Sequence, residues 1–171
     1  MPKPTKWFSN SMAGAPVCKG TASALIDLLT ACLIDGFNAG NLTSLVVASN
    51  VATANRTAHG FLQYQIVNIS GATPAELNGD FRILTVTADT FTFATVGVSD
   101  QPATGTISAK TPAVSSYWGK PFTGTNLAAF RSTDPAGTQR YLRIDDSVAL
   151  YSTLAIYEDM TAISTGTNSY A

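Results

Sequence analysis

The single histidine of the sequence, His59, is the residue best suited to acid–base chemistry near neutral pH. A histidine that acts as a general base needs a nucleophile and an orienting acidic group within hydrogen-bonding reach. His59 lies in the segment TAHGF, between Thr57 and Gly60, which is typical of a bend at the end of a strand. We therefore expect the His59 ring to hydrogen-bond to nearby backbone, with no catalytic role.

Two adjacent carboxylates, Asp145 and Asp146, offer the next candidate chemistry. Neighbouring side chains of a strand point to opposite faces, so this pair cannot converge on one substrate atom. We expect Asp145 to pair with Arg143 or Arg140 and Asp146 to stabilise a turn. A calcium site is the alternative, with the Glu158-Asp159 dipeptide as the further source of oxygen ligands.

The two cysteines, Cys18 and Cys32, are not part of a CxxC motif, and one histidine cannot complete a Cys/His zinc site with them. Cys32 falls on the apolar side of the helix predicted below, where we expect a small core residue. A disulfide between Cys18 and Cys32, or between subunits, stays open as the alternative.

Three aromatic residues, Tyr117, Trp118 and Phe122, lie close together in the sequence and could stack on a sugar ring. Such residues more often fill a loop or form an interface patch. The sequence has no GxSxG, no HExxH and no phosphate-binding glycine loop. We expect no catalytic residue, no cofactor and no metal.

The composition points toward an assembly component. Charged residues make up 12% of the 171 residues, about half the usual share, whereas there are 23 Thr and 24 Ala. Surface charge normally keeps a free monomer soluble, so a neutral surface suits a protein that neighbouring subunits cover. The net charge is −1 and the basic residues are scattered, so we expect no direct contact with nucleic acid.

The N-terminal part shows no membrane or export signal. Its longest apolar run is interrupted by Asp27 and Asp35, which argues against a transmembrane span. The start, MPKPTKWFSNSMAGAP, lacks the continuous apolar region of a secretory signal. We expect a protein that is made in a cytoplasm, does not insert into a membrane, and stays in place or is released by lysis.

The first 35 residues predict an arm followed by a helix. Residues 1–20 are rich in proline and glycine and contain Trp7 and Phe8, which indicates an extended arm with aromatic groups to bury, often on a neighbouring subunit. The segment TASALIDLLTACLIDGF has apolar residues at helical spacing and predicts an amphipathic helix over 22–35, with Thr21 as N-cap and Gly36 just past its end. Leu28 widens its apolar stripe.

After residue 40 the apolar residues no longer follow helical spacing, and the sequence consists of short segments typical of β-strands, separated by turn residues. The expected turn residues between them are Gly60, Gly71, Asn78 and Gly79. Ala88-Asp89 is expected to close a tight hairpin. We predict strands at 42–49, 51–57, 64–70, 80–87, 90–96 and 103–110. A loop at 111–126 and a polar tail at 163–171 flank three further strands, at 127–132, 140–147 and 149–160.

These elements predict an α+β, mostly β fold: one N-terminal amphipathic helix with antiparallel strands and an inserted small β-sandwich or barrel module. The expected organisation is an arm at 1–20, an assembly platform at 21–41 and 111–171, and the inserted module at 42–110.

The module resembles a known family. The segment TAHGF…VNISGATPAELNGDFRILTVTADTFTF is similar to a β-module that recurs in virion proteins of tailed bacteriophages. The shared features are a His-Gly pair and three turn or hairpin motifs, at His59-Gly60, Ile69–Ala72, Leu77–Gly79 and Thr90–Phe93. The segment GAPVCKGTASALIDLLTACLIDGF resembles an opening part of phage structural proteins. WGKPFTGTNLAAFRS, with YLRIDDS and YEDM…STGT, resembles their closing parts, so the resemblance covers about residues 12–167.

The resemblance implies a non-enzymatic component of the virion, in the tail, baseplate, neck or collar, or capsid surface. It implies a symmetric oligomer whose partners are copies of itself and other virion proteins. The apolar and aromatic residues expected at its interfaces are Trp7, Phe8, Leu28, Tyr117, Trp118 and Phe122. The alternative is a carbohydrate- or receptor-binding module of a phage tail, which would hold a host surface glycan on the last three of these residues.

Overall fold

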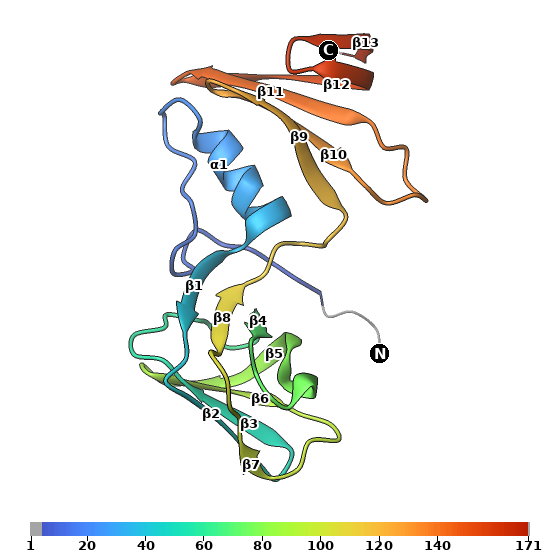
Figure 1. Ribbon diagram of the computed structural model, residues 1–171. Helices are drawn as coiled ribbons and strands as arrows, with labels where there is room; N and C mark the ends of the chain where they lie inside the picture. Colours follow the sequence, from blue (N-terminus) through green and yellow to red (C-terminus); the bar gives the residue numbers. More distant parts are fainter. Residues whose placement is uncertain (1–4, 171) are drawn as a thin grey trace. The chain divides into compact units, whose positions relative to one another are not determined.

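Antiparallel β-sheet makes up most of the computed structural model, which describes residues 5–170 (Figure 1). Strands account for 48% and helices for 9% of the chain, which confirms the predicted α+β, mostly β class. The chain divides into two units. The first contains the described residues up to Ala15 together with Gly36–Pro112, and the second contains Pro16–Asp35 and the residues from Ala113 onward.

The first unit is a curled half-barrel built on one eight-stranded sheet, with strand order β1-β8-β4-β5-β6-β3-β2-β7. Every pairing in it is antiparallel. Its strands are β1 (Phe37–Asn41), β2 (Ser44–Ala48), β3 (Val51–Asn55), β4 (Ile66–Ser70), β5 (Gly79–Val86), β6 (Thr90–Ala94), β7 (Gln101–Pro102) and β8 (Ser108–Thr111). A short 3-10 helix, Ala75–Leu77, precedes β5.

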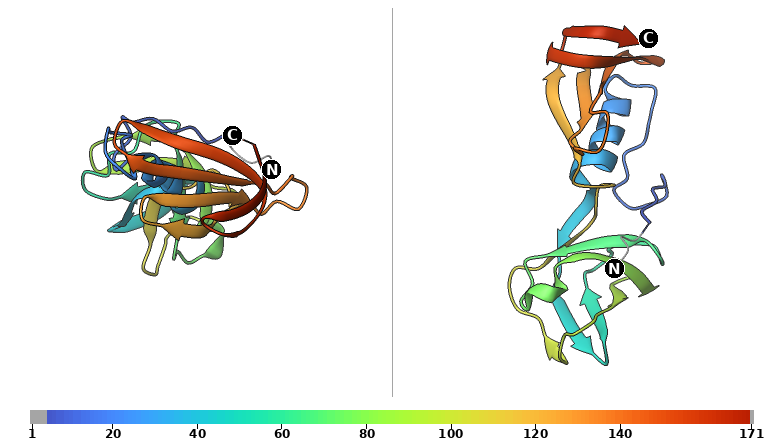
Figure 2. Two further views of the ribbon diagram at one scale, coloured as in Figure 1. Left: turned by 90° about the horizontal axis from the view of Figure 1, so that it is seen from above. Right: turned by 90° about the vertical axis from the view of Figure 1, so that its right-hand side faces the viewer.

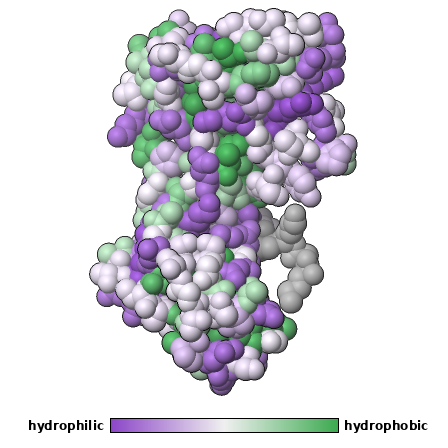
Figure 3. Space-filling view, in the orientation of Figure 1, coloured by the Kyte–Doolittle hydropathy of each residue, from purple (hydrophilic) through white to green (hydrophobic). Residues whose placement is uncertain are grey.

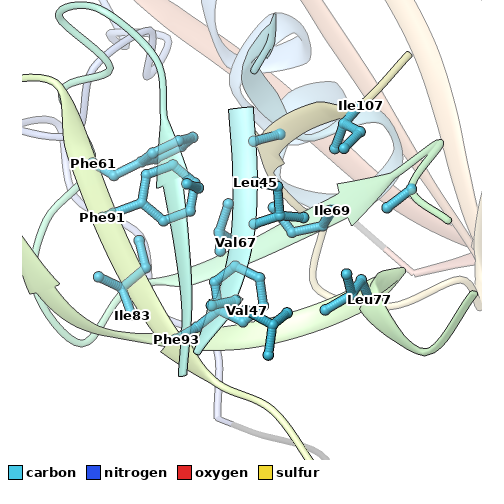
Figure 4. Close-up of a cluster of buried hydrophobic side chains, with 14 of the residues drawn as sticks. Leu45, Val47, Phe61, Val67, Ile69, Leu77, Ile83, Phe91, Phe93 and Ile107 are labelled. Carbon is cyan, nitrogen blue, oxygen red and sulfur yellow. The ribbon is translucent and has the colours of Figure 1, made fainter. Parts of the chain in front are cut away.

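One continuous core fills the curl of this sheet (Figure 4). Phe91 and Phe93 are fully buried because they alternate with outward threonines along β6. The Phe81 ring stacks on Phe93 with centroids 4.4 Å apart. The predicted hairpin is confirmed, since Thr87 donates its backbone N–H to the Thr90 carbonyl at 2.8 Å and so closes the turn between β5 and β6.

The turn residues expected in this unit have distinct geometries. Gly60, Gly71 and Gly79 all have positive φ, at 63°, 77° and 137°. Gly71 is the most constrained, because a Cβ there would lie 2.1 Å from the Thr106 carbonyl oxygen. Asn78 holds the same loop from its side chain, which accepts the Ala72 N–H at 2.8 Å and donates to the Ala72 carbonyl at 2.7 Å.

The second unit is a five-stranded antiparallel sheet with a helix on one face (Figures 1 and 2). The strand order is β13-β12-β11-β10-β9. The strands are β9 (Trp118–Gly124), β10 (Leu127–Ser132), β11 (Tyr141–Val148), β12 (Tyr151–Ala162) and β13 (Thr165–Tyr170). Each is joined to the next by a short connection, as in a meander.

The helix differs in detail from the one predicted over 22–35. It runs as α1 (Ala24–Thr30) and then as a π-helical turn, Ala31–Asp35. Its N-cap is Ser23, in a left-handed conformation without a side-chain cap bond, and not Thr21. The first-turn N–H of Leu25 is instead accepted by the Asp146 carboxylate at 2.9 Å. Gly36 has a φ of 73°, which confirms the predicted left-handed residue after the helix.

Two segments expected to lack regular structure form edge strands. Residues 111–126 contain β9, which lies at the edge of the five-stranded sheet. An edge strand tolerates a proline such as Pro121, which a central strand would exclude. Residues 163–171 were expected to be a polar tail, yet 165–170 form β13 against β12. A third strand, β1, was also missed, and its pairing with β8 extends the first unit to residue 36, beyond the predicted boundary at 42.

The predicted extended arm at 1–20 does not form one continuous feature. Its described residues up to Ala15 belong to the first unit, where Met12 is buried and the Phe8 and Phe37 rings lie 6.0 Å apart. Lys6 pairs with Asp80 at 2.8 Å. This part of the arm therefore packs on its own chain, whereas residues 16–20 belong to the second unit.

Candidate assembly surface

The helix covers one face of the five-stranded sheet over part of its width. α1 lies against β11 and the π-helical turn lies against β9. Beneath them, Ala128, Phe130 and Ile144 are fully buried, together with Ile26 from the helix. The helix packs here because its apolar stripe meets the apolar side chains that alternate along β10 and β11.

The same face continues beyond the helix onto β12 and β13. Ile144 pairs across the sheet with Leu154, and Ile156 pairs with Tyr170. Residues directly opposite each other on neighbouring strands share a face. Leu154, Ile156 and Tyr170 are nevertheless 48%, 42% and 53% exposed, so the helix leaves this half of the face uncovered.

We refer to Leu154, Ile156 and Tyr170 as the β12 surface. Further exposed apolar residues lie at the nearby turn between β11 and β12, where Leu150 is 90% exposed. Six of the fourteen exposed large hydrophobic residues of the described chain lie between 148 and 170. Figure 3 shows hydrophobic side chains at the surface of the part that carries this sheet. Such a grouping marks an interaction site more often than scattered single residues do.

A polar cluster borders the β12 surface at one end. The Glu158 carboxylate accepts hydrogen bonds from Asn168 at 2.6 Å and from the Tyr170 hydroxyl at 3.0 Å, with Arg140 at 3.4 Å. These hydrogen bonds, with the Arg140 charge as a smaller cause, lower the pKa of Glu158 from its usual value. The Arg140 guanidinium also lies 5.2 Å from the Tyr170 ring centroid. The Tyr170 ring is thereby held in place.

On the opposite face of the sheet, side chains of the strands form a second, small core. Tyr141 is buried there, with Phe122 at 5.9 Å between ring centroids. Arg131 lies over the Tyr141 ring at 4.8 Å and donates to its hydroxyl at 2.9 Å. Ala129 and Met160 complete this small core. The two faces therefore differ, since one is packed by the helix beside the β12 surface and the other has only this small core of strand side chains.

The predicted aromatic platform is not formed. Trp118 pairs with Ser132 and packs with the helix-side core, whereas Phe122 pairs with Ala129 and packs on the opposite face. Tyr117, 44% exposed, precedes β9. A β-bulge between Gly119 and Phe122 reverses the alternation, so Trp118 and Phe122 lie on opposite faces of β9 and these aromatics cannot stack together on one sugar ring.

The other interface candidates are distributed over both units. Trp7 is 42% exposed and Phe8 is half-buried in the first unit. Leu28 is half-buried on α1 in the second. The sequence pattern did not single out the β12 surface. The sequence does contain one signal for this surface, the four consecutive apolar residues Leu154–Tyr157. Such a run gives a strand that is apolar on both faces, which indicates that both faces contact other groups.

The residues that could have carried chemistry are engaged in structural contacts. The predicted role of His59 is confirmed: its Nδ1 accepts the Phe61 N–H at 2.9 Å and its Nε2 lies 3.0 Å from the Thr90 carbonyl. Because Nδ1 accepts, Nε2 carries the proton and donates. The Asp145 carboxylate lies 3.8 Å from Arg143, as predicted.

Asp146 departs from its predicted role in a turn. It is buried and accepts hydrogen bonds from the Leu25 N–H and the Ser152 hydroxyl, so it ties the helix to the sheet. The expected opposite orientation of the two aspartates is confirmed by these separate partners. The described residues contain no group of three or more His, Cys, Asp or Glu side chains arranged for a metal ion.

Both cysteines are free thiols. Cys18 is exposed, whereas Cys32 is half-buried in the π-helical turn and its pKa is raised by that burial. The Cys32 thiol therefore stays protonated at neutral pH, which makes it a poor nucleophile.

Among the described residues, no helix is long and apolar enough to cross a membrane. Comparison with models of known protein families gives no match, and a search of curated proteins gives no relative of significant similarity.

Proposed function

We propose that this chain is a non-enzymatic structural component of a tailed-phage particle, in the tail, baseplate, neck or collar, or capsid surface. It assembles there as a symmetric oligomer with copies of itself and with other virion proteins. The observation that carries the proposal is the β12 surface, an uncovered half of a sheet face in a chain with only 12% charged residues. The phage attribution depends on the resemblance of residues 12–167.

The physical argument starts from the cost of leaving apolar side chains in water. Leu154, Ile156 and Tyr170 are each at least 42% exposed, and the helix that covers the neighbouring strands does not reach them. Their burial against a partner would be favourable in proportion to the apolar area removed from water. A polar rim formed by Arg140 and Glu158 would give that contact a defined orientation.

The contacts of the candidate catalytic residues support a structural role, because His59 and Asp146 use their polar atoms to hold backbone groups. The turn residues Gly71 and Asn78 likewise hold a loop in place. Glycan binding is not favoured as a second function, because Trp118 and Phe122 lie on opposite faces of β9.

The proposal is tested on particles purified from lysates of the bacterium that carries the gene. Quantitative mass spectrometry should find the chain at a fixed ratio to the major capsid protein, and an antibody raised against it should label one position on the particle. Absence of the chain from intact tailed particles would overturn the proposal. Leu154→Ser should reduce incorporation, whereas Val96→Ser, at a 72% exposed site in the first unit, should not.

A further inference from the structure

The outer edge of β13 differs from the other three sheet edges of the chain. We infer that it pairs with the β13 edge of a second copy, in antiparallel orientation about a two-fold axis perpendicular to the sheet. The two five-stranded sheets then continue as one. This inference rests on the proposed function, because it names one contact through which copies associate. It depends on two observations, the condition of the four sheet edges and the sequence of β13 itself.

Three of the four edge strands are protected against pairing. The edges are β1 and β7 in the first unit and β9 and β13 in the second. An edge strand presents unpaired N–H and C=O groups, so natural sheets shorten, bend or block it. β7 has only two residues, one of them Pro102. β9 contains Lys120 and Pro121, and a proline has no N–H to donate. β1 pairs with β8 in an irregular register, and the Arg56 guanidinium donates to its Asn38 carbonyl at 2.9 Å.

None of these devices is present in β13. Its six residues, TGTNSY, include no charged residue and no proline, and all of them are exposed. Within the described chain it pairs only with β12 and forms the end of its sheet (Figure 1). Alternate residues of such a strand present their N–H and C=O groups outward, where another extended chain can pair with them. The β13 edge is therefore suited to the addition of a strand.

The sequence of β13 identifies a second copy as the strand that fits. Antiparallel pairing joins outward-facing residues with outward-facing residues, so the register must place one residue opposite its own copy. When that residue is Asn168, the two side-chain amides lie opposite each other and can exchange N–H···O bonds. Thr167 then lies opposite Ser169, a hydroxyl pair of the kind that stabilises sheets. Gly166 lies opposite Tyr170, so the tyrosine ring meets no side chain there. In this register β13 is complementary to itself.

The charges nearest to this edge do not oppose a second copy. Glu158 lies one strand away, on β12, where its carboxylate contacts Arg140 at 3.4 Å and Asn168 at 2.6 Å. Neighbouring strands are about 4.8 Å apart, so three strand spacings, about 14 Å, separate the backbones of the two Glu158 residues. This separation exceeds the Debye length of about 8 Å at physiological ionic strength.

The same pairing explains why association would end at two copies. The contact is isologous, because each β13 is both the added strand and the edge that receives it. After pairing, both outer edges of the joined ten-stranded sheet are β9 strands, which carry Lys120 and Pro121. No β13 edge is then left to add a third copy.

Sedimentation velocity on the purified full chain tests the inference. We expect a reversible monomer–dimer equilibrium below about 1 mM, because six residues of each copy make a small contact. The double variant Thr167→Lys/Ser169→Lys places lysine opposite lysine twice across the axis and should weaken dimerisation at least about tenfold. Thr123→Lys/Thr125→Lys adds the same charges at exposed positions in and beside β9 and should leave the Kd unchanged. Circular dichroism confirms that each variant is folded.

A charge exchange makes the test specific. The acidic counterpart, Thr167→Glu/Ser169→Glu, should also dimerise at least about tenfold more weakly than the parent chain when it is alone. In an equimolar mixture of the lysine and glutamate variants, opposite charges meet in both pairs. The mixture should therefore form a heterodimer with an affinity close to that of the parent. Non-specific association of apolar surfaces would not show this recovery.

A cysteine on the axis tests the register. Both native cysteines are free thiols, so they are first replaced, by Cys18→Ser and Cys32→Ala. Asn168→Cys in this background places two thiols on directly opposite residues, whose Cα atoms are about 4.5–5.5 Å apart. This spacing permits a disulfide, so mild oxidation should give a covalent dimer. Val96→Cys in the same background, at an exposed valine of the first unit, is the control and should stay monomeric.

The outcomes separate this inference from the proposed function. A parent chain that stays monomeric up to about 1 mM overturns the β13 contact, and so does a dimer that the two lysines leave intact. Larger species, a mixture that fails to recover affinity, or the absence of a cross-link at position 168 also overturn it. The proposed function is judged independently, by the presence of the chain in purified particles.

Discussion

The two units of the chain bury the apolar side chains of their sheets in different ways. The first bends one long sheet around a single core, so its apolar side chains meet one another from strands on all sides (Figure 4). The second keeps its sheet open and must cover two faces. One face has a small core around Tyr141, Ala129 and Met160, and the helix covers only part of the other.

The difference shows why a small β-protein can leave part of an apolar sheet face exposed to solvent. A curled sheet hides its apolar face by its own curvature. An open sheet depends on what else the chain supplies, and one helix of seven α-helical residues does not span five strands. The first unit is therefore expected to be the stable part, and the second the part whose surface is completed by association.

Removal of a core ring from each unit should give the largest effects. Phe91→Ala in the first unit should lower the free energy of unfolding by about 3–5 kcal/mol, and Phe130→Ala in the second by about 3 kcal/mol. Both rings are fully buried, but Phe130 lies in a smaller cluster with half-buried neighbours that can collapse into the space. Urea denaturation followed by circular dichroism measures both changes.

A fluorescence reporter assigns each loss to its unit. Trp7 lies in the first unit and Trp118 in the second, so a Trp7→Phe background leaves Trp118 as reporter of the second unit. Phe91→Ala should shift the dichroism transition and leave the Trp118 transition in place. A shift of the Trp118 transition as large as that caused by Phe130→Ala would show that the two units unfold together.

A backbone substitution should have the next largest effect and tests how tightly the first unit is packed. Gly71→Ala and Gly97→Ala both place a Cβ on a left-handed residue, with φ of 77° and 73°. The space around them differs, because a Cβ at Gly71 meets the Thr106 carbonyl at 2.1 Å, whereas at Gly97 nothing lies within 4 Å. We expect a loss of about 2–4 kcal/mol at Gly71 and about 1 kcal/mol at Gly97.

Thermal denaturation measures this pair of variants. Equal shifts in Tm would mean that the Thr106 backbone moves aside, and that the first unit is less rigid than its core indicates.

Most of the first unit could be predicted from sequence because its signals are local. The alternation of Phe91 and Phe93 with threonines, and the turn at Ala88-Asp89, fix a hairpin within about a dozen residues. The missed strands lack such alternation. The segment TGTNSY forms β13 through backbone pairing with β12 and through the contacts of Asn168 and Tyr170 with Glu158, which only the folded chain brings together.

The surface of the second unit was harder to predict for the same reason. Leu154 and Ile156 read as ordinary strand residues, and their exposure depends on how far the helix extends across the sheet. The helix itself begins at Ala24 because Asp146, 121 positions from Leu25, accepts a first-turn N–H. A helix cap supplied from another strand leaves no trace in the residues next to the helix. Local capping rules therefore selected Thr21.

Loss of that distant cap should give a moderate effect confined to the second unit. Asp146→Ala leaves the Leu25 N–H and the Ser152 hydroxyl without their partner and should cost about 1–3 kcal/mol. Asp145→Ala is the matched control, because the Asp145 side chain is 34% exposed and its carboxylate bonds to Ser147 beside it, so its loss should lower stability much less than the loss of Asp146. Urea denaturation followed by Trp118 fluorescence compares them. Equal effects would remove Asp146 as the link between helix and sheet.

The smallest effect is a pH dependence of the β12–β13 pairing, at the edge of the second unit's sheet, where every residue of β13 is exposed. The pKa of Glu158 is lowered in the folded chain by hydrogen bonds from Asn168 and Tyr170, and then by Arg140. Because its pKa is lowered in the folded chain, ionised Glu158 stabilises the fold at pH values above 4.5, the ordinary pKa of this carboxyl group. This contribution is lost as the pH falls below that value and through the folded pKa. Hydrogen-exchange protection of the β13 amides, corrected for intrinsic rates, should fall over this range.

Glu158→Gln separates this carboxylate from the general effect of acid. The variant should show weaker β13 protection at neutral pH, because a neutral amide is a weaker acceptor for Asn168 and Tyr170 than a carboxylate. Its β13 protection should then change little between neutral pH and about pH 3, since position 158 no longer titrates. Asp145→Asn removes another carboxylate with a lowered pKa from the same sheet and should leave the β13 profile as in the parent chain. If Glu158→Gln and the parent lose protection in parallel, β13 is held by its backbone pairing alone, and the polar rim does not order the β12 surface.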